Sequence, residues 1–339
     1  MTAPLRPPVH RLELPDALVA VSGSPDASRA VVGGAAGGLW ILHGRGELQA
    51  RLPGHSDGLF QAAWQPNGPW IASCGQDGHA RIWNPDSGLE VAAIPGGTDW
   101  VEQLAWSPSG EWLAIGAGRT LTLWHRERGI VHTLRDHRNT LSAITWRPDS
   151  QIVAAACYGG VHLYDLATAT RQGILPWKTS MLSLAWSPDQ RWVVAGTQDL
   201  AVQVWPYPFT EGSELAMSGY EAKVRELAWH PSGRYLATGG ASAIMVWDCA
   251  GKGPAGTTPR MLDAHMARVS ALAYQHRGHV LASGGLDGQV FLWNAGKSSK
   301  PLLQSTVGSP VTALTATADD RQFIATCHNG TVAWIQSPV

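Results

Sequence analysis

An internal repeat constrains this chain more than any other feature of its sequence. Two segments carry the same four residue types at the same spacings of 18, 4 and 6 residues, namely His55, Ser73, Asp77 and Trp83 and again His265, Ser283, Asp287 and Trp293. A repeat of this kind determines the architecture and shows which residues have structural duties, so it takes precedence over single motifs.

A large residue that ends the first strand of most repeats, two positions before a Pro, marks further copies, as in Trp106-Ser107-Pro108. These anchor positions are Gly23, Trp64, Trp106, Trp146, Trp186, Trp229, Tyr274 and Ala316. Successive anchors are 40 to 45 residues apart. The spacing predicts eight units.

Each unit contains short runs of period-2 character bounded by Gly, Pro, Asn or Asp, which is typical of strands. The third strand of every unit is predicted to end in an aromatic residue, at Trp40, Trp83, Trp124, Tyr164, Trp205, Trp247, Trp293 and Trp334. A fourth strand follows in units one to seven, for example from Glu90 to Ile94. No window has a sustained period of 3.6 residues, so almost no helix is expected.

The eighth unit has no room for a fourth strand, because only five residues follow Trp334. The strand-like stretch from Val9 to Leu14 is unassigned and is predicted to complete that unit. The alternative is a ring of seven with one weak unit left over, since Gly23 and Ala316 are not aromatic. That ring would leave an apolar sheet edge unpaired.

The Gly-His pair before a strand, the Asp in a tight turn and the Trp closing the next strand resemble the WD-repeat β-propeller family, whose repeat is about 40 to 45 residues long. The resemblance covers nearly the whole chain. It implies an all-β fold, and we expect one domain over residues 1–339 with eight four-stranded blades. It also implies that the N-terminal strand closes the ring.

His55, Ser73 and Asp77 are also the residue types of a nucleophilic triad. The resemblance implies instead a buried hydrogen-bond relay that ends on the indole N–H of Trp83. A buried carboxylate or imidazole requires such partners, because leaving one unpaired costs several kcal/mol. We therefore expect a structural relay here and no catalytic site.

The relay is complete only in units two and seven. Asp199 and His137 are interpreted as isolated remnants of it, while Trp177 and Tyr220 occupy the position of the His. The other units are expected to depend more on aromatic packing and to be less rigid.

Composition and charge disfavour several classes of partner. The net charge is -1 and Lys and Arg form no runs, which disfavours nucleic acid and anionic membranes as partners. Residues 1–10 lack the apolar core of a signal peptide, and no apolar run approaches the 18 or more residues of a membrane span. The four cysteines form no Cys-x-x-Cys pair, so we expect a reducing cytoplasm.

Neither a metal site nor a cofactor is predicted. Cysteine and histidine are neighbours at Cys74 and His79, Cys157 and His162, and Cys327 and His328, but these pairs belong to separate units and no turn offers more than two ligands. The Gly-rich stretches at 33–38 and 296–299 match neither a dinucleotide fingerprint nor a phosphate-binding loop.

Tryptophan gives the most informative signal for a binding site. The repeat explains 15 of the 17 tryptophans, leaving Trp100 and Trp177 in loops that precede first strands. In WD-repeat proteins, partners often dock on the face of the ring that carries these loops. The residues six and four positions before each anchor, and those in nearby turns, make most of the contacts. The candidate partner-binding residues are Phe60, Trp100, Glu102, Tyr158, Trp177, Leu182, Lys223, Arg225 and Arg268, with Gln76, Gln198 and Leu286 beside them. Aromatic residues and Arg are typical of interface hot spots.

Both tryptophans also have a packing interpretation. Trp177 could fill the space of the missing His, and Trp100 could cover a loop.

These features predict a monomeric, non-catalytic scaffold or adaptor that presents one propeller face to a protein partner. An alternative is an accessory or regulatory subunit of an enzyme, since the phrase from Trp247 to Pro254 is similar to WD-repeat proteins encoded beside metal-chaperone GTPases in bacteria. That similarity also favours a bacterial source. A third alternative, a propeller enzyme with a site in the central channel, would rest on the scattered acids Glu102 and Glu226.

Overall fold

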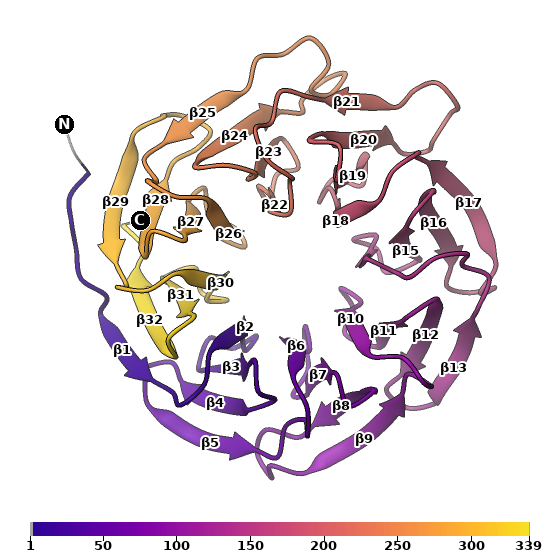
Figure 1. Cartoon of the computed structure of the whole chain (residues 1–339), viewed down its shortest axis with the longest axis horizontal. Coiled ribbons are helices and arrows are strands. Elements are labelled where there is room, and N and C mark those ends of the chain that lie inside the picture. The colour runs from indigo at the N-terminus through magenta and orange to yellow at the C-terminus, as the bar shows by residue number, and fades with distance from the viewer. Residues whose placement is uncertain (1–2, 339) are drawn as a thin grey trace.

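The computed structural model describes residues 3–338, and within that range every regular element is a β-strand. It therefore contains no helix long and apolar enough to cross a membrane. The strands form eight four-stranded sheets that stand side by side around a central axis (Figure 1). The predicted eight-bladed propeller is confirmed, and the ring of seven is excluded.

Blades are numbered by the order of their first strands. Blade one is β2 (Leu18–Gly23), β3 (Arg29–Gly34), β4 (Leu39–His43) and β5 (Leu48–Leu52). Blade two is β6 (Leu59–Trp64), β7 (Ile71–Gly75), β8 (His79–Trp83) and β9 (Glu90–Pro95). Blade three is β10 (Val101–Trp106), β11 (Trp112–Ala117), β12 (Thr120–His125) and β13 (Gly129–Leu134). Blade four is β14 (Ala143–Trp146), β15 (Ile152–Cys157), β16 (Gly160–Asp165) and β17 (Arg171–Pro176).

The remaining blades follow the same order. Blade five is β18 (Met181–Trp186), β19 (Trp192–Thr197), β20 (Val202–Pro206) and β21 (Leu215–Met217). Blade six is β22 (Leu227–Trp229), β23 (Tyr235–Thr238), β24 (Ala243–Asp248) and β25 (Arg260–Asp263). Blade seven is β26 (Val269–Tyr274), β27 (Leu281–Gly285), β28 (Gln289–Trp293) and β29 (Pro301–Thr306). Blade eight is β30 (Val311–Ala316), β31 (Gln322–Cys327), β32 (Thr331–Gln336) and, at its outer edge, β1 (His10–Glu13).

The strand pattern follows from where each residue lies in the ring. Each of the eight predicted anchors is the last residue of the first strand of its blade. The second strands are sandwiched between neighbouring blades, and every residue of β11, β15 and β19 is buried. The outer strands alternate between buried and exposed residues because only one face packs. The core is therefore a series of apolar layers between blades.

Strand β1 closes the ring, as predicted for Val9 to Leu14. It pairs antiparallel with β32, with His10 opposite Trp334 and Glu13 opposite Thr331. Backbone hydrogen bonds extend the pairing at both ends, from the Val9 amide to the Trp334 carbonyl oxygen (2.8 Å) and from the Leu14 amide to the Gly330 carbonyl oxygen (2.9 Å). Figure 1 shows the first and last strands side by side in one blade.

The N-terminal segment also contacts blade seven. Leu5 forms a parallel bridge with Gln304 on β29, and the Arg6 amide donates to the Gln304 carbonyl oxygen at 2.9 Å. The segment from Pro4 to Leu18 thus touches blades seven, eight and one in turn. This contact was not expected from the sequence.

The prediction that every third strand ends in an aromatic residue is wrong in two blades. In blade two Trp83 pairs with Ile71, seven residues after the anchor. The equivalent residues are Leu42, opposite Ala30, in blade one and Ile335, opposite Phe323, in blade eight. Matching by residue type alone placed Trp40 two residues and Trp334 one residue out of register.

Trp40 and Trp334 instead fill the layer between the last and first blades. Both are buried, in one cluster with Leu14, Leu18 and Val332. The ring of His10 lies edge-on to the Trp334 indole, with centroids 6.5 Å apart. Aromatic bulk is therefore present at the seam where the two ends of the chain meet.

Deletion of residues 1–15 is expected to cause aggregation, because it exposes the long edge of β32 and opens this seam. Deletion of residues 1–7 removes only the contact with β29 and serves as the matched control. Size-exclusion chromatography with light scattering compares the two. If the 1–15 deletion elutes as a single species like the parent, β1 is not needed for closure.

Candidate partner-binding face

The first strands contain a local irregularity that displays side chains at their beginning. In six blades the first strand skips one residue in its pairing with the second strand. In blade two, Leu59 pairs with Gly75 and Gln61 pairs with Cys74, so Phe60 has no partner. Glu102 and Leu182 are skipped in the same way. A β-bulge re-aims a side chain, and these are the predicted positions four residues before the anchor.

We call the face on which first strands begin the upper face and the opposite face the lower face. The upper face carries the loops before first strands and the turns between second and third strands. Trp100 lies there, in the loop between β9 and β10, and is 54% exposed. Its indole lies against the half-buried ring of Phe60, with centroids 6.0 Å apart and the planes tilted by 45°. The structure thus brings two predicted residues from neighbouring blades together.

A hollow of about 300 Å³ adjoins this aromatic pair, lined by Thr98, Asp99, Trp100, Glu102, Gly118 and Thr140. It combines an indole face with the carboxylates of Asp99 and Glu102. Aromatic faces attract both apolar groups and cations. The hollow is chemically suited to an apolar or cationic side chain of a partner.

Other apolar side chains are exposed on the same face. Tyr158, a predicted residue, lies in the turn between β15 and β16 and is 56% exposed. Met266 is 91% exposed, Leu286 45% and Leu200 40%. Sequence reasoning missed Met266 and Leu200. Met266 directly follows the relay residue His265 and so could have been assigned to this face.

Leu200 has an unusual backbone conformation. It occupies the turn position held by Gly78 and Gly288 in the two complete repeats, and its φ is +57°, against +75° and +70° for the glycines. A non-Gly residue in the left-handed region is disfavoured by roughly 1 kcal/mol or more. The ring does not require an exposed leucine at this turn.

The basic candidates lie across the central opening from Trp100, because blades six and seven stand opposite blades two and three (Figure 1). Lys223, Arg225 and Arg268 are exposed there. A guanidinium nitrogen of Arg268 lies 3.7 Å from a carboxylate oxygen of Glu226, whose side chain is 7% exposed. Burial raises the pKa of Glu226, and Arg268 opposes that shift. Among the predicted residues, the aromatic pair and Glu102 therefore lie on one side of the upper face and the three basic residues on the other.

Trp177 differs from Trp100 in its surroundings. It is half-buried and packs against the apolar layer between blades four and five. Its indole N–H donates to the Thr179 hydroxyl at 3.0 Å, and that hydroxyl donates to Asp199 at 3.0 Å. These contacts favour the packing interpretation, and Asp199 is not the isolated remnant that the sequence indicated. Leu182, on β18, is half-buried nearby.

The predicted relay residues of blade two form one hydrogen-bonded chain. The Trp83 indole N–H donates to the Ser73 hydroxyl (2.8 Å), which contacts Nε2 of His55 (2.8 Å), and Nδ1 of His55 contacts Asp77 (2.9 Å). Burial opposes ionisation of Asp77, but hydrogen bonds from His55 and Arg81 outweigh it and lower its pKa to about 2.

The Ser73 hydroxyl is not available as a nucleophile, because both its proton and its oxygen take part in hydrogen bonds. Burial lowers the pKa of His55, so its imidazole is neutral at pH 7 and donates from Nδ1 to the carboxylate. Its Nε2 then accepts the Ser73 O–H, while the Ser73 oxygen accepts the indole N–H of Trp83. Ser73 is fully buried. Ser73, His55 and Asp77 are the residue types of a catalytic triad, but they are buried and a substrate cannot reach them.

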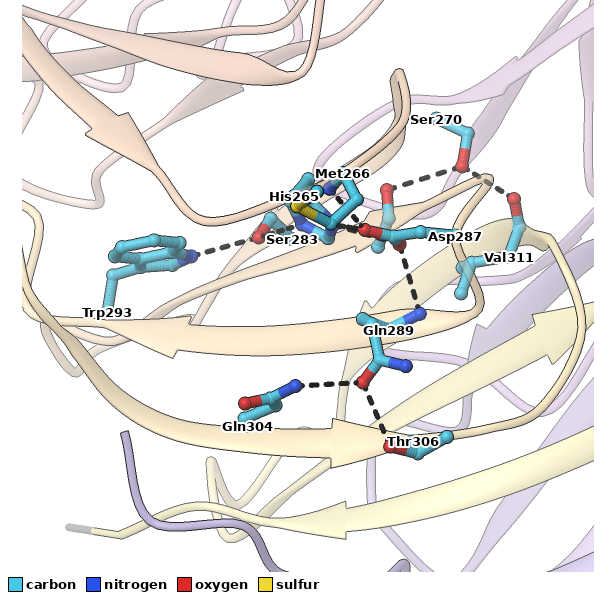
Figure 2. Close-up of polar contacts among 11 residues, drawn as sticks. His265, Met266, Ser270, Ser283, Asp287, Gln289, Trp293, Gln304, Thr306 and Val311 are labelled. Atoms are coloured by element: carbon cyan, nitrogen blue, oxygen red, sulfur yellow. Dashed lines mark hydrogen bonds and ion pairs between the residues drawn. The ribbon is translucent and has the colours of Figure 1, made fainter. Parts of the chain in front are cut away.

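Blade seven repeats this arrangement. Nδ1 of His265 lies 3.1 Å from both carboxylate oxygens of Asp287, Nε2 lies 2.9 Å from the Ser283 hydroxyl, and Trp293 donates to that hydroxyl at 2.9 Å. Figure 2 shows the four side chains in line.

Comparison with known families agrees with this geometry. The model of the WD domain, G-beta repeat, matches residues 46–84, 88–125, 128–165, 172–206, 213–248 and 256–294. The chain belongs to the WD-repeat family. The matched segments leave out most of blade one and all of blade eight, whose first strands end in Gly23 and Ala316.

Relatives of this WD-repeat chain include a ribosome biogenesis protein WDR12 homolog of Chlamydomonas reinhardtii, 27% identical over 73% of this chain and 55% of its own length. Cell division cycle 20.1, cofactor of APC complex, of Arabidopsis thaliana is 28% identical over 47% of this chain and 34% of its own length. The chain thus spans about half the length of these curated relatives, or less. The crystal structure of the computationally designed Ika8 protein has a TM-score of 0.84 at 21% identity, covering 98% of this chain and 100% of that one, and shares the fold.

Two other WD repeats of the chain contain rebuilt relays. In blade six the Tyr220 hydroxyl contacts the Thr238 hydroxyl at 2.8 Å and accepts the Trp247 indole N–H at 2.9 Å, replacing both His and Ser. In blade four Tyr164 donates to Asp136 at 2.7 Å and lies 3.0 Å from Nε2 of His137. His137 is therefore not an isolated remnant, and polar networks persist in blades expected to depend more on aromatic packing.

The relays also position loops of the upper face. In blade seven a carboxylate oxygen of Asp287 accepts the backbone N–H of Met266 at 2.8 Å, which fixes the loop that exposes Met266 (Figure 2). The same carboxylate accepts the Gln289 amide at 3.1 Å. The complete relay of blade seven thus joins the buried Trp293 to an exposed loop.

The substitutions Asp77→Ala and Asp287→Ala are each expected to destabilise the protein by roughly 2 to 4 kcal/mol, the range for removing one member of a buried polar network. Both carboxylates are more than nine-tenths buried, so solvent screens them little. Urea unfolding of the purified variants measures the change. Asp86→Ala is the control, because Asp86 is exposed and outside the relay. Unfolding curves that overlay those of the parent would mean that the relay contributes no stability.

The free energy of unfolding is expected to fall as the pH decreases from about 6.5, the ordinary pKa of a histidine side chain, toward 4. Burial lowers the pKa of His55, His137 and His265, and lowers that of His162 to about 4. The unfolded chain binds protons in this window and the folded chain does not, so acid favours unfolding. Asp77, with a pKa of about 2, loses its contribution only at lower pH.

Melting temperatures measured from pH 8 to pH 4.5 test this expectation. The variant His162→Phe should show a shallower decrease than the parent. A melting temperature that stays constant between pH 7 and pH 5 would contradict it.

Proposed function

We propose that this chain is a cytoplasmic, non-catalytic scaffold or adaptor that uses its upper face to bind a protein partner. The observation that carries the proposal is Trp100, an indole that the repeat does not require and that is 54% exposed against Phe60. A tryptophan in a loop gains little by remaining in water, whereas burying its large apolar area in an interface is favourable. A partner supplies that burial.

The distribution of side chains around the upper face supports the same proposal. Exposed Met266, Leu200 and Tyr158 lie in different blades, so apolar contacts are spread around the rim. Acidic Glu102 and basic Arg225 stand on opposite sides. Charge arranged in this way orients a partner and suppresses wrong ones more than it adds affinity. The WD-repeat relative in Arabidopsis is described as a cofactor of the APC complex, and we propose a comparable dependence on partners here.

The sequence from Trp247 to Pro254 suggested a role beside a metal-chaperone GTPase. The structure of this segment does not support that role. Cys249 is 1% exposed, so its thiol is not available as a ligand. Gly253 has a φ of +90° and lies against the Trp192 ring. Within residues 3–338 no three His, Cys, Asp or Glu side chains are arranged to hold a metal ion. The organisms of the relatives are eukaryotes, so these relatives lend no support to a bacterial source.

The proposal predicts that Trp100→Ala abolishes capture of a partner while leaving the fold intact. Truncating a hot-spot tryptophan typically costs about 2 kcal/mol or more of binding, roughly thirtyfold in affinity, whereas a change in an exposed loop has little effect on stability. Quantitative pull-downs from the native host should therefore identify a protein that the parent retains and Trp100→Ala loses. Titration of that protein gives the affinities.

Three controls separate binding from folding. Leu89→Ala removes an exposed apolar side chain, 67% exposed, from the lower face and should leave binding unchanged. Trp177→Ala should lower the melting temperature more than Trp100→Ala, because Trp177 packs. Trp83→Ala provides the core reference. If Trp100→Ala binds as tightly as the parent, or melts as early as Trp83→Ala, the assignment of Trp100 to an interface is wrong.

A further inference from the structure

The anchor tryptophans show how a large side chain fits at the lower face. The Trp106 indole N–H donates to the carbonyl oxygen of Ala63 in the preceding blade at 3.3 Å, and Trp146 donates to that of Ala105 at 2.9 Å. Both acceptors are one residue before an anchor. At these two places the anchor indole fills the space between the ends of two first strands and occupies a carbonyl there, whereas the indole N–H groups of the anchors Trp186 and Trp229 have no partner among residues 3–338.

Blades one and eight lack this side chain at two adjacent places, because their anchors are Gly23 and Ala316. A cavity of about 400 Å³ lies where the missing side chains would be, and Gly23 and Ala316 line it together with Trp64, His276, Arg277 and Thr315. Ligand pockets have volumes of about 300 to 1,000 Å³. The cavity is on the lower face, since first strands end there, and is separate from the proposed partner site.

The walls of the cavity define what fits. Trp64 forms part of the wall with the small exposed part of its indole, whose ring lies 5.1 Å from the Arg29 guanidinium carbon. Thr315 holds the position equivalent to Ala63 and Ala105, so its carbonyl oxygen is where an anchor of blade one would donate. Gly23 has no side chain to do so. A planar aromatic group with an N–H donor matches this part of the cavity.

One cationic side chain, Arg277, lies at the edge of the cavity, next to His276, whose Nε2 lies 3.3 Å from the Ala316 carbonyl oxygen. Asp320 accepts the backbone amides of His276, Arg277 and Gly278 at 2.6, 2.8 and 3.1 Å, so its carboxylate holds this turn in place through the main chain. The guanidinium of Arg277 makes no ion pair with any of the described residues 3–338. It is exposed and adjoins the cavity, and guanidinium groups bind carboxylates through two parallel hydrogen bonds.

We propose that this cavity binds a free aromatic carboxylate. The ring occupies the place of the missing anchor between the ends of β2 and β30, against Trp64, and the carboxylate pairs with Arg277. The site is independent of the upper face, so its existence does not depend on the proposed scaffold function.

Titration of the full-length protein with indole-3-acetate tests this assignment by ligand-observed NMR and calorimetry. Binding should be saturable with a Kd on the order of 1 mM or tighter, as expected for a small ligand. Acetate should not compete, because it lacks the ring. Arg277→Gln should weaken indole-3-acetate about tenfold, as loss of a charged hydrogen bond implies, and leave 3-methylindole unchanged. Absence of saturable binding, or equal affinity in Arg277→Gln, overturns the proposal.

Gly23→Trp restores the anchor and should abolish binding. A Cβ at Gly23 would lie 3.7 Å from the Ala316 carbonyl oxygen and 4.0 Å from Thr317 Cα, which are ordinary contacts, so the backbone tolerates a side chain there. The matched control is Gly173→Trp on β17, where a Cβ meets nothing within 4 Å and binding should persist. Unaltered binding by a folded Gly23→Trp overturns the proposal. If that variant does not fold, Ala316→Leu gives the same test from the other strand.

A capped Trp-Asp dipeptide separates a free ligand from a side chain of a partner. The proposal expects indole-3-acetate to bind at least as tightly as the dipeptide. A dipeptide that binds more than tenfold tighter would show that the cavity recognises a polypeptide and would overturn the assignment to a free ligand.

Discussion

Each blade has two apolar faces, and each face must be covered by a neighbouring blade. An open row of blades would leave one face bare at either end, so the stability of every layer depends on the ring being closed. Four residues of β1 provide that closure by pairing with β32. Trp40 and Trp334 fill the layer at the same seam from opposite sides. Closure therefore combines backbone pairing at the outer edge with aromatic packing inside.

A second constraint acts within the layers. A buried polar group on a large aromatic side chain is stabilised by a partner, because an unpaired buried donor costs free energy, and the buried indoles of Trp205 and Trp334 lack one within the part of the chain that the structure describes. Blades two and seven meet this need with Ser, His and Asp, whereas blade six uses the hydroxyls of Tyr220 and Thr238. Several residue combinations meet the same requirement, so the number of complete motifs understates the number of polar networks in the ring.

The sequence alone predicted the blade number, all eight anchors and the closing strand, because these follow from a period that many residues enforce together. It misplaced Trp40 and Trp334, since residue type was taken as the guide where strand pairing decides the register. The hydrogen bonds of Asp199 and His137 were also missed. Tyr164 stands at the third-strand position where the relay ends, but its contact with His137 was missed because the motif was matched by residue type. Thr179 becomes a neighbour of Asp199 only when the turns are folded.

The candidate site was predictable in part for the same reason. Counting tryptophans against the repeat identified Trp100 correctly as a residue that the core does not use, but it could not separate Trp100 from Trp177, which differ in burial and not in sequence position. The absence of an aromatic anchor at Gly23 and Ala316 was visible in the sequence. That the two gaps merge into one cavity depends on the meeting of the first and last blades.

The bulge at the start of the first strands determines how easily the side chains of the upper face can be replaced. Phe60, Glu102 and Leu182 take no part in the pairing between first and second strands. A different side chain at any of them alters the chemistry of the rim and leaves the hydrogen-bonded ladder as it is. The ring therefore separates the residues that maintain its architecture from those that set the chemistry of its upper face, so that chemistry can change one position at a time while the blades stay the same.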